Sequence, residues 1–290
     1  MQMIANTLIL ASMYSLIGCG FVLVYRTSRV VNLAQGELMA LGGYFLFTVV
    51  LGILRAPVPS FLLASIFSLC LGFAVYFFLM RFLAGESVFA AILTTIALGI
   101  LFRGSITLIW TSQLFRPLQT MGIANGSHTL VGGIVVSTFG IVSFVGAACL
   151  YLGLFFWLKF TRVGLRMRAV GENPLLASRR GIALHNYYAL SWGLAALTAG
   201  FAGMIQSCDA ILQPGIVSVG LKTFPVVLVG GLDSLVGVIP GALVVAVAEV
   251  VAINYISPQA SEAAPFVVLL VMLLVRPWGL FGTKEELERV

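Results

Sequence analysis

Charged residues are scarce in this chain of 290 residues. They make up 9% of the sequence, whereas hydrophobic residues make up 60%. A soluble domain has about 25% charged residues, so this chain has too few to cover a surface exposed to water. The mean hydropathy of +1.10 indicates that lipid is the surrounding solvent. The composition therefore excludes an ordinary soluble enzyme or binding domain.

Residues suited to metal or nucleophilic chemistry are also few. There are two histidines and four cysteines, and no two cysteines form a CxxC pair. The protease and hydrolase motifs HExxH and GxSxG are absent. Residues 215–223 approach a phosphate-binding loop, but Leu221 separates the second glycine from the lysine. We therefore predict no metal site, no cofactor bound by this chain and no enzymatic activity.

Long apolar runs fill most of the sequence. A helix needs about 20 residues to cross the hydrocarbon core, and continuous runs favour helices over the alternating pattern of a β-barrel. We predict an all-α, polytopic transmembrane helix bundle with about eight or nine spans, forming one domain over residues 1–290. The predicted spans are 4–25, 34–54, 60–80, 88–110, 137–160, 188–207, 216–231, 236–255 and 263–275.

Two regions depart from this regular pattern. Segment 216–231 is short for a crossing, follows Pro214 and contains Pro225, so we predict a re-entrant or broken helix there. Such backbone is allowed at membrane depth only where protein or water surrounds it. The loop 111–133 is rich in turn residues, and we predict a short hairpin that ends in segment 134–137.

Basic residues are concentrated on alternate loops. The loops on one side hold only Arg55 and Arg116, and the richer side is expected to be cytoplasmic. Nine crossings then place the N-terminus outside and the C-terminus in the cytoplasm. The net charge of +6 thus reflects membrane topology, and no nucleic-acid partner is expected. The richer side carries Arg26, Arg29, Arg81, Lys159, Arg162, Arg166, Arg168, Arg179, Arg180, Arg276, Lys284 and Arg289.

Small residues recur at every fourth position in three predicted spans. This spacing lets two helices approach closely in lipid. It fits packing within the chain, and it also fits a dimer face. The three sets are Ala91, Thr95 and Gly99; Ala195, Ala199 and Gly203; and Gly237 and Gly241.

Four ionisable residues lie within or beside predicted spans: Glu37, Arg103, Lys222 and Glu249. Each costs at least about 2.5–3.5 kcal/mol at membrane depth, so each is expected to face the bundle interior or water. Lys222 has Asp209 and Glu249 as possible partners, or it extends toward the membrane surface. Glu37, expected near the cytoplasmic end of its span, either caps the helix start or lines a cavity. Structural pairing and a transport role both stay open.

The cytoplasmic segment 168–186 contains a short amphipathic helix by its sequence signals. Asn173 is a good N-cap, Pro174 suits the first turn, and Gly181 ends the helix. Its apolar residues Leu175 and Leu176 are followed by arginines. Such a helix either anchors the loop on anionic membrane lipid or docks on a cytoplasmic partner.

Four blocks of sequence resemble the branched-chain amino acid permeases of ABC transporters. They are NLAQGELMALGGY at 32–44, the loop 168–182, the stretches 220–224 and 229–237, and RPWGLFG at 276–282. Their order over nearly the whole chain makes the resemblance specific. Gln35 stands where the family often has histidine, and Asp233 stands where glycine is common.

The resemblance implies a permease subunit of an ATP-driven importer in the bacterial inner membrane. The expected substrates are small amino acids, most simply leucine, isoleucine and valine. Related permeases carry urea, short amides or aromatic acids. The implied partners are a second homologous permease subunit, an extracytoplasmic substrate-binding protein, and cytoplasmic ATPase subunits that bind ATP and Mg.

The resemblance also assigns a coupling role to the cytoplasmic loop, whereas the translocation residues are a hypothesis from polar residues within or beside the spans. Ala177 and Gly181 match the loose coupling pattern E-A-A-x-x-x-G, whose first positions are here occupied by leucines. The predicted coupling residues are Glu172, Asn173, Pro174, Leu175, Leu176, Ala177, Arg179, Arg180 and Gly181. The predicted translocation residues are Asn32, Gln35, Glu37, Lys222 and Glu249. A standalone carrier driven by protons or sodium is the alternative from another class.

Overall fold

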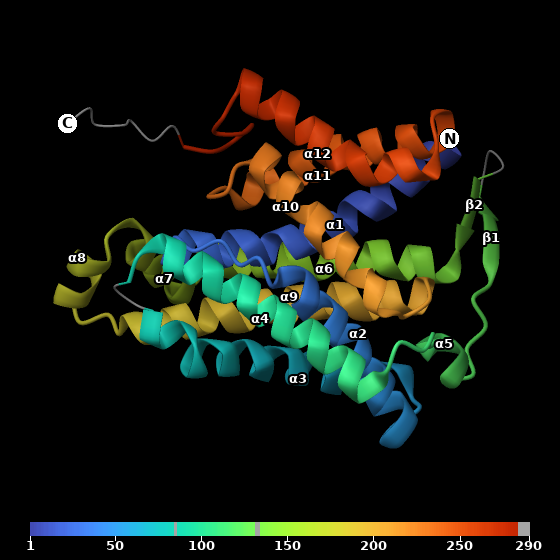
Figure 1. The fold of residues 1–290 in the computed structure, drawn as a ribbon, viewed down its shortest axis with the longest axis horizontal. Helices are drawn as coiled ribbons and strands as arrows, with labels where there is room; N and C mark the ends of the chain where they lie inside the picture. The colour runs from blue at the N-terminus through green and yellow to red at the C-terminus, as the bar shows by residue number, and fades with distance from the viewer. Residues whose placement is uncertain (84–85, 131–133, 284–290) are drawn as a thin grey trace.

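The computed structural model describes residues 1–83, 86–130 and 134–283. Long helices account for most of these residues (Figure 1). Eight of them are long and apolar enough to span a membrane, which confirms the predicted bundle. They are α1 (Gln2–Ser28), α2 (Gln35–Gly52), α3 (Pro57–Phe78), α4 (Val88–Trp110), α6 (Thr138–Phe160), α9 (Leu184–Asp209), α11 (Leu235–Tyr255) and α12 (Pro258–Val275).

Shorter elements connect the long helices. Strands β1 (Ser127–Leu130) and β2 (Ile134–Ser137) pair antiparallel, which confirms the predicted hairpin. Gly132 and Gly133 in its connection, and Lys284 and Arg289 of the tail, lie outside the described residues. The other short elements are α5 (Pro117–Thr120), α7 (Arg162–Glu172), α8 (Pro174–Arg179), α10 (Val217–Gly230), η1 (Met80–Leu83) and η2 (Pro214–Ile216).

The long helices run roughly along one axis, so the molecule has two ends (Figure 1). The N-terminus, α5 and the hairpin lie at one end, while α7, α8 and the last described residues lie at the other. We call these the hairpin end and the α8 end. Helices α10, α11 and α12 form a layer on one side of α1, and α2, α3 and α9 pack together on its other side.

Helix α2 begins in the middle of the bundle. The side chain of Gln35 lies against Gly20 of α1, and its amide nitrogen donates to the carbonyl of Ala195, near the centre of α9. Gly20 precedes the end of α1 by eight residues, about 12 Å of helix. The chain therefore turns back into the bundle over residues 29–34 before α2 starts.

Helix α10 also begins inside the bundle. Leu212 lies beside Gly43 of α2, and Val217 lies beside Gly36, two turns nearer the start of α2. The residues before α10 thus run inward along α2, and Gly220 of α10 contacts Gly36 directly. At 14 residues α10 is about 21 Å long, short of a crossing, as predicted for this segment. Pro225 lies within α10 and does not end it.

The non-helical backbone at both starts has hydrogen-bond partners. The Asn32 side-chain oxygen accepts from the Ala34 amide at 3.1 Å, and the Thr95 hydroxyl accepts from the Leu33 amide at 3.2 Å. Leu212 exchanges two backbone bonds with Phe115, of 2.9 and 3.0 Å. These bonds matter because lipid supplies no donors or acceptors for exposed backbone.

Glycines allow the closest helix contacts. A Cβ on Gly42 of α2 would overlap the backbone of Gly200 on α9, and a Cβ on Gly203 would overlap the Met39 carbonyl. Gly237 likewise packs against the Gly230 backbone. The seams that contain Gly203 and Gly237 therefore join helices of the same chain.

Gly42→Ala tests this close packing. We expect it to destabilise the folded protein by about 1–3 kcal/mol, because a methyl group must enter an already filled contact. Gly153→Ala is the matched control, since α6 leaves open space around Gly153. The control should be neutral or stabilising by up to about 1 kcal/mol. Thermal unfolding of both variants in detergent makes the comparison, and equal melting temperatures would contradict the packing.

Candidate functional site

An ion pair lies at mid-depth between α2 and α4. The Arg103 guanidinium donates to the Glu37 carboxylate at 2.7 Å. Glu37 occupies the first turn of α2, where the helix terminus favours a carboxylate. Gly99 at the centre of α4 makes room, because a Cβ there would lie 3.2 Å from Glu37 Oε2. That oxygen is buried and has no hydrogen-bond partner among the described residues.

The expected depth of Glu37 was wrong. The sequence predicts a position near the cytoplasmic end, because Glu37 follows soon after α1 at the start of a new span. The chain first returns into the bundle, so the carboxylate lies beside the middle of α4. The sequence singled out Arg103 as intramembrane but contained no signal for its partner.

Asn32 and Gln35, which precede Glu37 at the start of α2, are fully buried. The Asn32 amide donates to Gln35 Oε1 at 2.8 Å, and Gln35 Nε2 donates to the Ala195 carbonyl at 3.0 Å. Together they fasten the start of α2 to α9. Thr95, predicted from sequence only as a small residue of a packing seam, completes this arrangement through the Leu33 amide.

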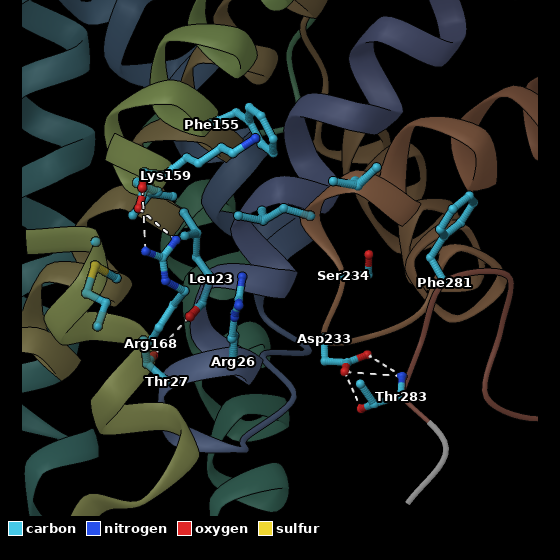
Figure 2. Close-up of a pocket in the computed structure, with 15 residues that line it drawn as sticks. Leu23, Arg26, Thr27, Phe155, Lys159, Arg168, Asp233, Ser234, Phe281 and Thr283 are labelled. Atoms are coloured by element: carbon cyan, nitrogen blue, oxygen red, sulfur yellow. Dashed lines mark hydrogen bonds between the residues drawn. The ribbon is translucent and has the colours of Figure 1, made fainter. Parts of the chain in front are cut away.

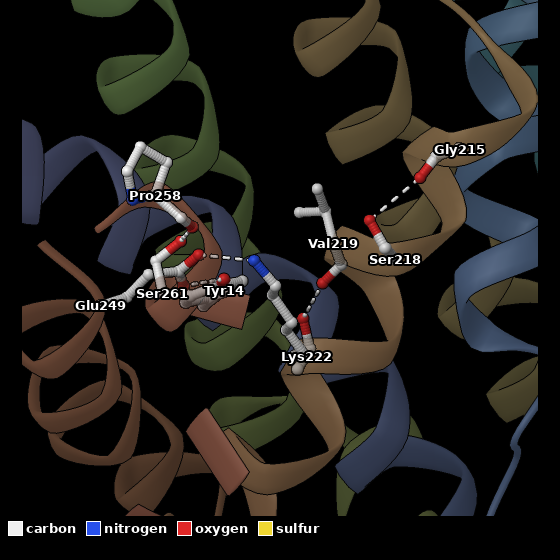
Figure 3. A network of polar contacts seen from close by, with 9 residues as sticks. Tyr14, Gly215, Ser218, Val219, Lys222, Glu249, Pro258 and Ser261 are labelled. Atoms are coloured by element: carbon white, nitrogen blue, oxygen red, sulfur yellow. Dashed lines mark hydrogen bonds and ion pairs between the residues drawn. The ribbon is translucent and has the colours of Figure 1, made fainter. Parts of the chain in front are cut away.

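A second buried cluster joins α1, α10 and α11 (Figure 3). Lys222 Nζ donates to Glu249 Oε1 at 2.7 Å, and the Tyr14 hydroxyl donates to Glu249 Oε2 at 2.5 Å. Of the partners considered for Lys222, the structure therefore selects Glu249. Asp209 instead accepts from the Ser137 hydroxyl at 3.4 Å. Tyr14 could not be found from sequence, because a tyrosine in an apolar run has no polar signature.

The predicted helix of the 168–186 loop is present as α8 at one end of the molecule (Figure 1). The Asn173 side chain accepts from the Leu176 amide at 2.9 Å, and Gly181 has a φ of +76°. The N-cap and the glycine stop are thus confirmed. Ala177 is buried, whereas Leu175 is 62% exposed and Leu176 is 56% exposed. A separate helix that the sequence did not predict, α7, precedes it.

A cavity of about 420 Å³ opens beside α7 at the α8 end (Figure 2). Arg26 and Arg168 line one wall, and Asp233 and Thr283 line the other. Asp233 accepts from the Thr283 amide at 3.3 Å and also from its hydroxyl. This carboxylate therefore fastens the α10–α11 connection to the segment after α12. The cavity separates α7 from that connection.

These features define a class of protein. The described residues combine eight membrane-length helices, two ion pairs between helices and an exposed short helix at one end. The described residues contain no group of three or more histidine, cysteine, aspartate or glutamate side chains able to hold a metal. This arrangement is typical of the membrane subunit of a transporter. A family model described as the permease component of the branched-chain amino acid transport system matches residues 3–276, and the chain belongs to that family.

Individual relatives match over the full chain. The permease protein BraD of the high-affinity branched-chain amino acid transport system of Pseudomonas aeruginosa is 26% identical, with 100% of this chain and 98% of BraD covered. The permease LivH of the corresponding Salmonella typhimurium system is also 26% identical, with 100% and 97% covered. A probable LivH permease of Methanocaldococcus jannaschii is 25% identical, with 100% and 95% covered. The chain is therefore a multi-pass, non-catalytic membrane subunit of this ABC transporter family.

Removal of one partner tests the buried cluster. We expect Lys222→Met to destabilise the protein by about 3–5 kcal/mol, because Glu249 is then buried without its cation. Adding Glu249→Gln should restore most of this loss, since the amide oxygen still accepts from Tyr14. Thermal unfolding of the single and double variants measures both effects. A double variant no more stable than Lys222→Met would show that the two charges are not coupled.

Proposed function

We propose that this chain is the permease subunit of an ATP-driven importer for small amino acids, with leucine, isoleucine and valine as substrates. The family supports a permease of this system, and the relatives BraD and LivH are described as branched-chain amino acid permeases. A second homologous permease completes the membrane unit. An extracytoplasmic binding protein delivers the substrate, and ATP and Mg bind to cytoplasmic ATPase subunits.

The observation that carries the proposal is the exposed leucine pair on α8. Leu175 and Leu176 project from a short helix that is capped at its start and stopped by Gly181. Ala177, on the other side of α8, is buried. Apolar side chains held out on a rigid helix suit a groove on a protein partner. We infer that the coupling segment 168–186 docks there on the ATPase, through the residues predicted from sequence.

The charge distribution supports an orientation for this unit. The α8 end carries Arg162, Arg166, Arg168, Arg179 and Arg180, and excess arginine favours the cytoplasm. We propose that the α8 end is cytoplasmic, in the bacterial inner membrane, and that the N-terminus and hairpin face outward. The same basic surface suits contact with anionic membrane lipid.

We propose that the translocation path passes α4 at the depth where α2 and α10 begin. Glu37 borders the path, Asn32 and Gln35 hold the start of α2 in place, and Lys222 with Glu249 holds α10. Helices that begin at mid-depth are typical of transporter substrate sites. Closure of the ATPases, transmitted through α7 and α8, would move α6 and α9 relative to the α10–α12 layer. That rocking would alternate access from the two sides.

The two ion pairs weigh against a standalone ion-coupled carrier. Such a carrier needs a carboxylate at membrane depth that is free to take a proton or sodium. Glu37 and Glu249 each have a cation 2.7 Å away. Urea, short amides and aromatic acids stay as alternative substrates of a permease in the same family.

Uptake by the assembled transporter tests the proposed function. We expect vesicles that contain the chain with its co-purified partners and binding protein to accumulate leucine only when ATP is supplied. Dissipating the proton and sodium gradients should leave this uptake unchanged. Gradient-driven uptake by the chain alone would contradict the proposal.

The docking helix has its own test. We expect Leu175→Glu with Leu176→Glu to weaken binding of the ATPase by well over about tenfold, because two leucines no longer bury apolar surface. Leu114→Glu is the control, since Leu114 is equally exposed at 62% but lies between α4 and α5 at the opposite end. ATPase activity that co-purifies with each variant is the measurement. Equal activity with the double variant and the control would place the ATPase contact elsewhere.

A further inference from the structure

The outer face of α4 carries a charge that the fold of one chain leaves half exposed. The Arg103 side chain is 53% exposed, whereas its partner Glu37 is 5% exposed. The contact joins one guanidinium nitrogen to one carboxylate oxygen at 2.7 Å. A guanidinium has five donor hydrogens, and most of those of Arg103 point to no described residue.

The position of Arg103 excludes hydrocarbon as its surroundings. The ion pair lies beside Gly99, the central residue of α4, so the guanidinium is far from either end of the span. Arginines at such depth face water or protein. Residues on other faces of α4, such as Leu101 and Leu108, are exposed and apolar, as lipid contact requires.

We propose that Arg103 lines the aqueous translocation path and binds the carboxylate of the α-amino acid passing through it. The proposal rests on the proposed function, and it assigns substrate binding to Arg103, a residue for which the sequence left a transport role open. A guanidinium matches a carboxylate geometrically, with two parallel N–H···O bonds. Glu37 leaves the outward donors of Arg103 available, because it holds the guanidinium from the buried side.

Glu37 acts as a positioning residue. It fixes the guanidinium at mid-depth, and its charge offsets that of Arg103, so a substrate carboxylate meets a pair that is neutral overall. Binding is then weak enough for the substrate to leave, as conduction along a path requires. Gly104, one residue beyond Arg103, also borders open space, since a Cβ there would meet nothing within 4 Å.

An Arg103→Cys substitution tests the proposal in the complete transporter. Cys70 and Cys149 are exposed and would be replaced by serine, whereas Cys19 and Cys208 are buried. Reconstituted Arg103→Cys transporter would be treated with two water-soluble methanethiosulfonates, one ending in a sulfonate and one in an ammonium group. We expect both reagents to label the introduced thiol, and saturating leucine with binding protein and ATP to slow labelling. Leu101→Cys, at similar depth on the opposite side of α4, should not be labelled.

Uptake after labelling separates a binding role from a purely structural one. Arg103→Cys should lose at least about tenfold of leucine uptake, because losing even one of the two charge-assisted hydrogen bonds has an effect of that size. The ammonium reagent should restore part of the uptake, and the sulfonate reagent should not. Adding Glu37→Gln should abolish this rescue, because nothing then holds the ammonium in place.

Three results would overturn the proposal. An Arg103→Cys transporter that neither reagent labels would place Arg103 outside an aqueous path. Labelling that leucine does not slow, or sulfonate and ammonium derivatives with equal uptake, would remove the carboxylate contact. If the wild-type complex shows no ATP-driven uptake of any amino acid, the proposed function fails as well. Labelling of the Arg103→Cys variant then still shows, independently of transport, whether this face of α4 is exposed to water.

Discussion

Two helices that start in the middle of the bundle determine much of this structure. Backbone outside a helix at membrane depth needs hydrogen-bond partners from protein, because lipid offers none. Asn32 and Thr95 supply them before α2, and the Phe115–Leu212 backbone pair supplies them before α10. Gly36 and Gly220 let the two starts touch. The arrangement therefore depends on residues from α4, from the α4–α5 connection and from both helix starts.

The charges at mid-depth follow from the same constraint. A helix start favours a nearby carboxylate, and Glu37 occupies that place in α2. Its cation comes from α4, a helix that crosses the outer face of the molecule. The Lys222–Glu249 pair, in contrast, is enclosed by α1, α10 and α11 and holds them together. One pair is thus enclosed within the fold, while the other leaves the Arg103 side chain half exposed.

Local sequence signals predicted local structure well. The cap, proline and glycine of α8 are each encoded within a few residues, and the structure has that helix between Pro174 and Arg179. The hairpin and most spans were found for the same reason. Helix α12 begins at Pro258 rather than 263, because Ser257 caps it and proline suits its first turn. Helix α7 was missed, since its alternation of arginines with apolar residues looked like a plain basic loop.

The sequence by itself determined the solvent, the fold class, the approximate spans and, through its ordered motifs, the permease family. Those properties depend on composition and on short-range spacing. Tertiary structure alone decided the depth of Glu37, its pairing with Arg103 and the participation of Tyr14 in the Lys222–Glu249 cluster. Each of these depends on contacts between residues distant along the chain. The depth of Glu37 is set by residues 29–34, which turn back into the bundle. No local sequence pattern encodes how far into the bundle such a segment extends.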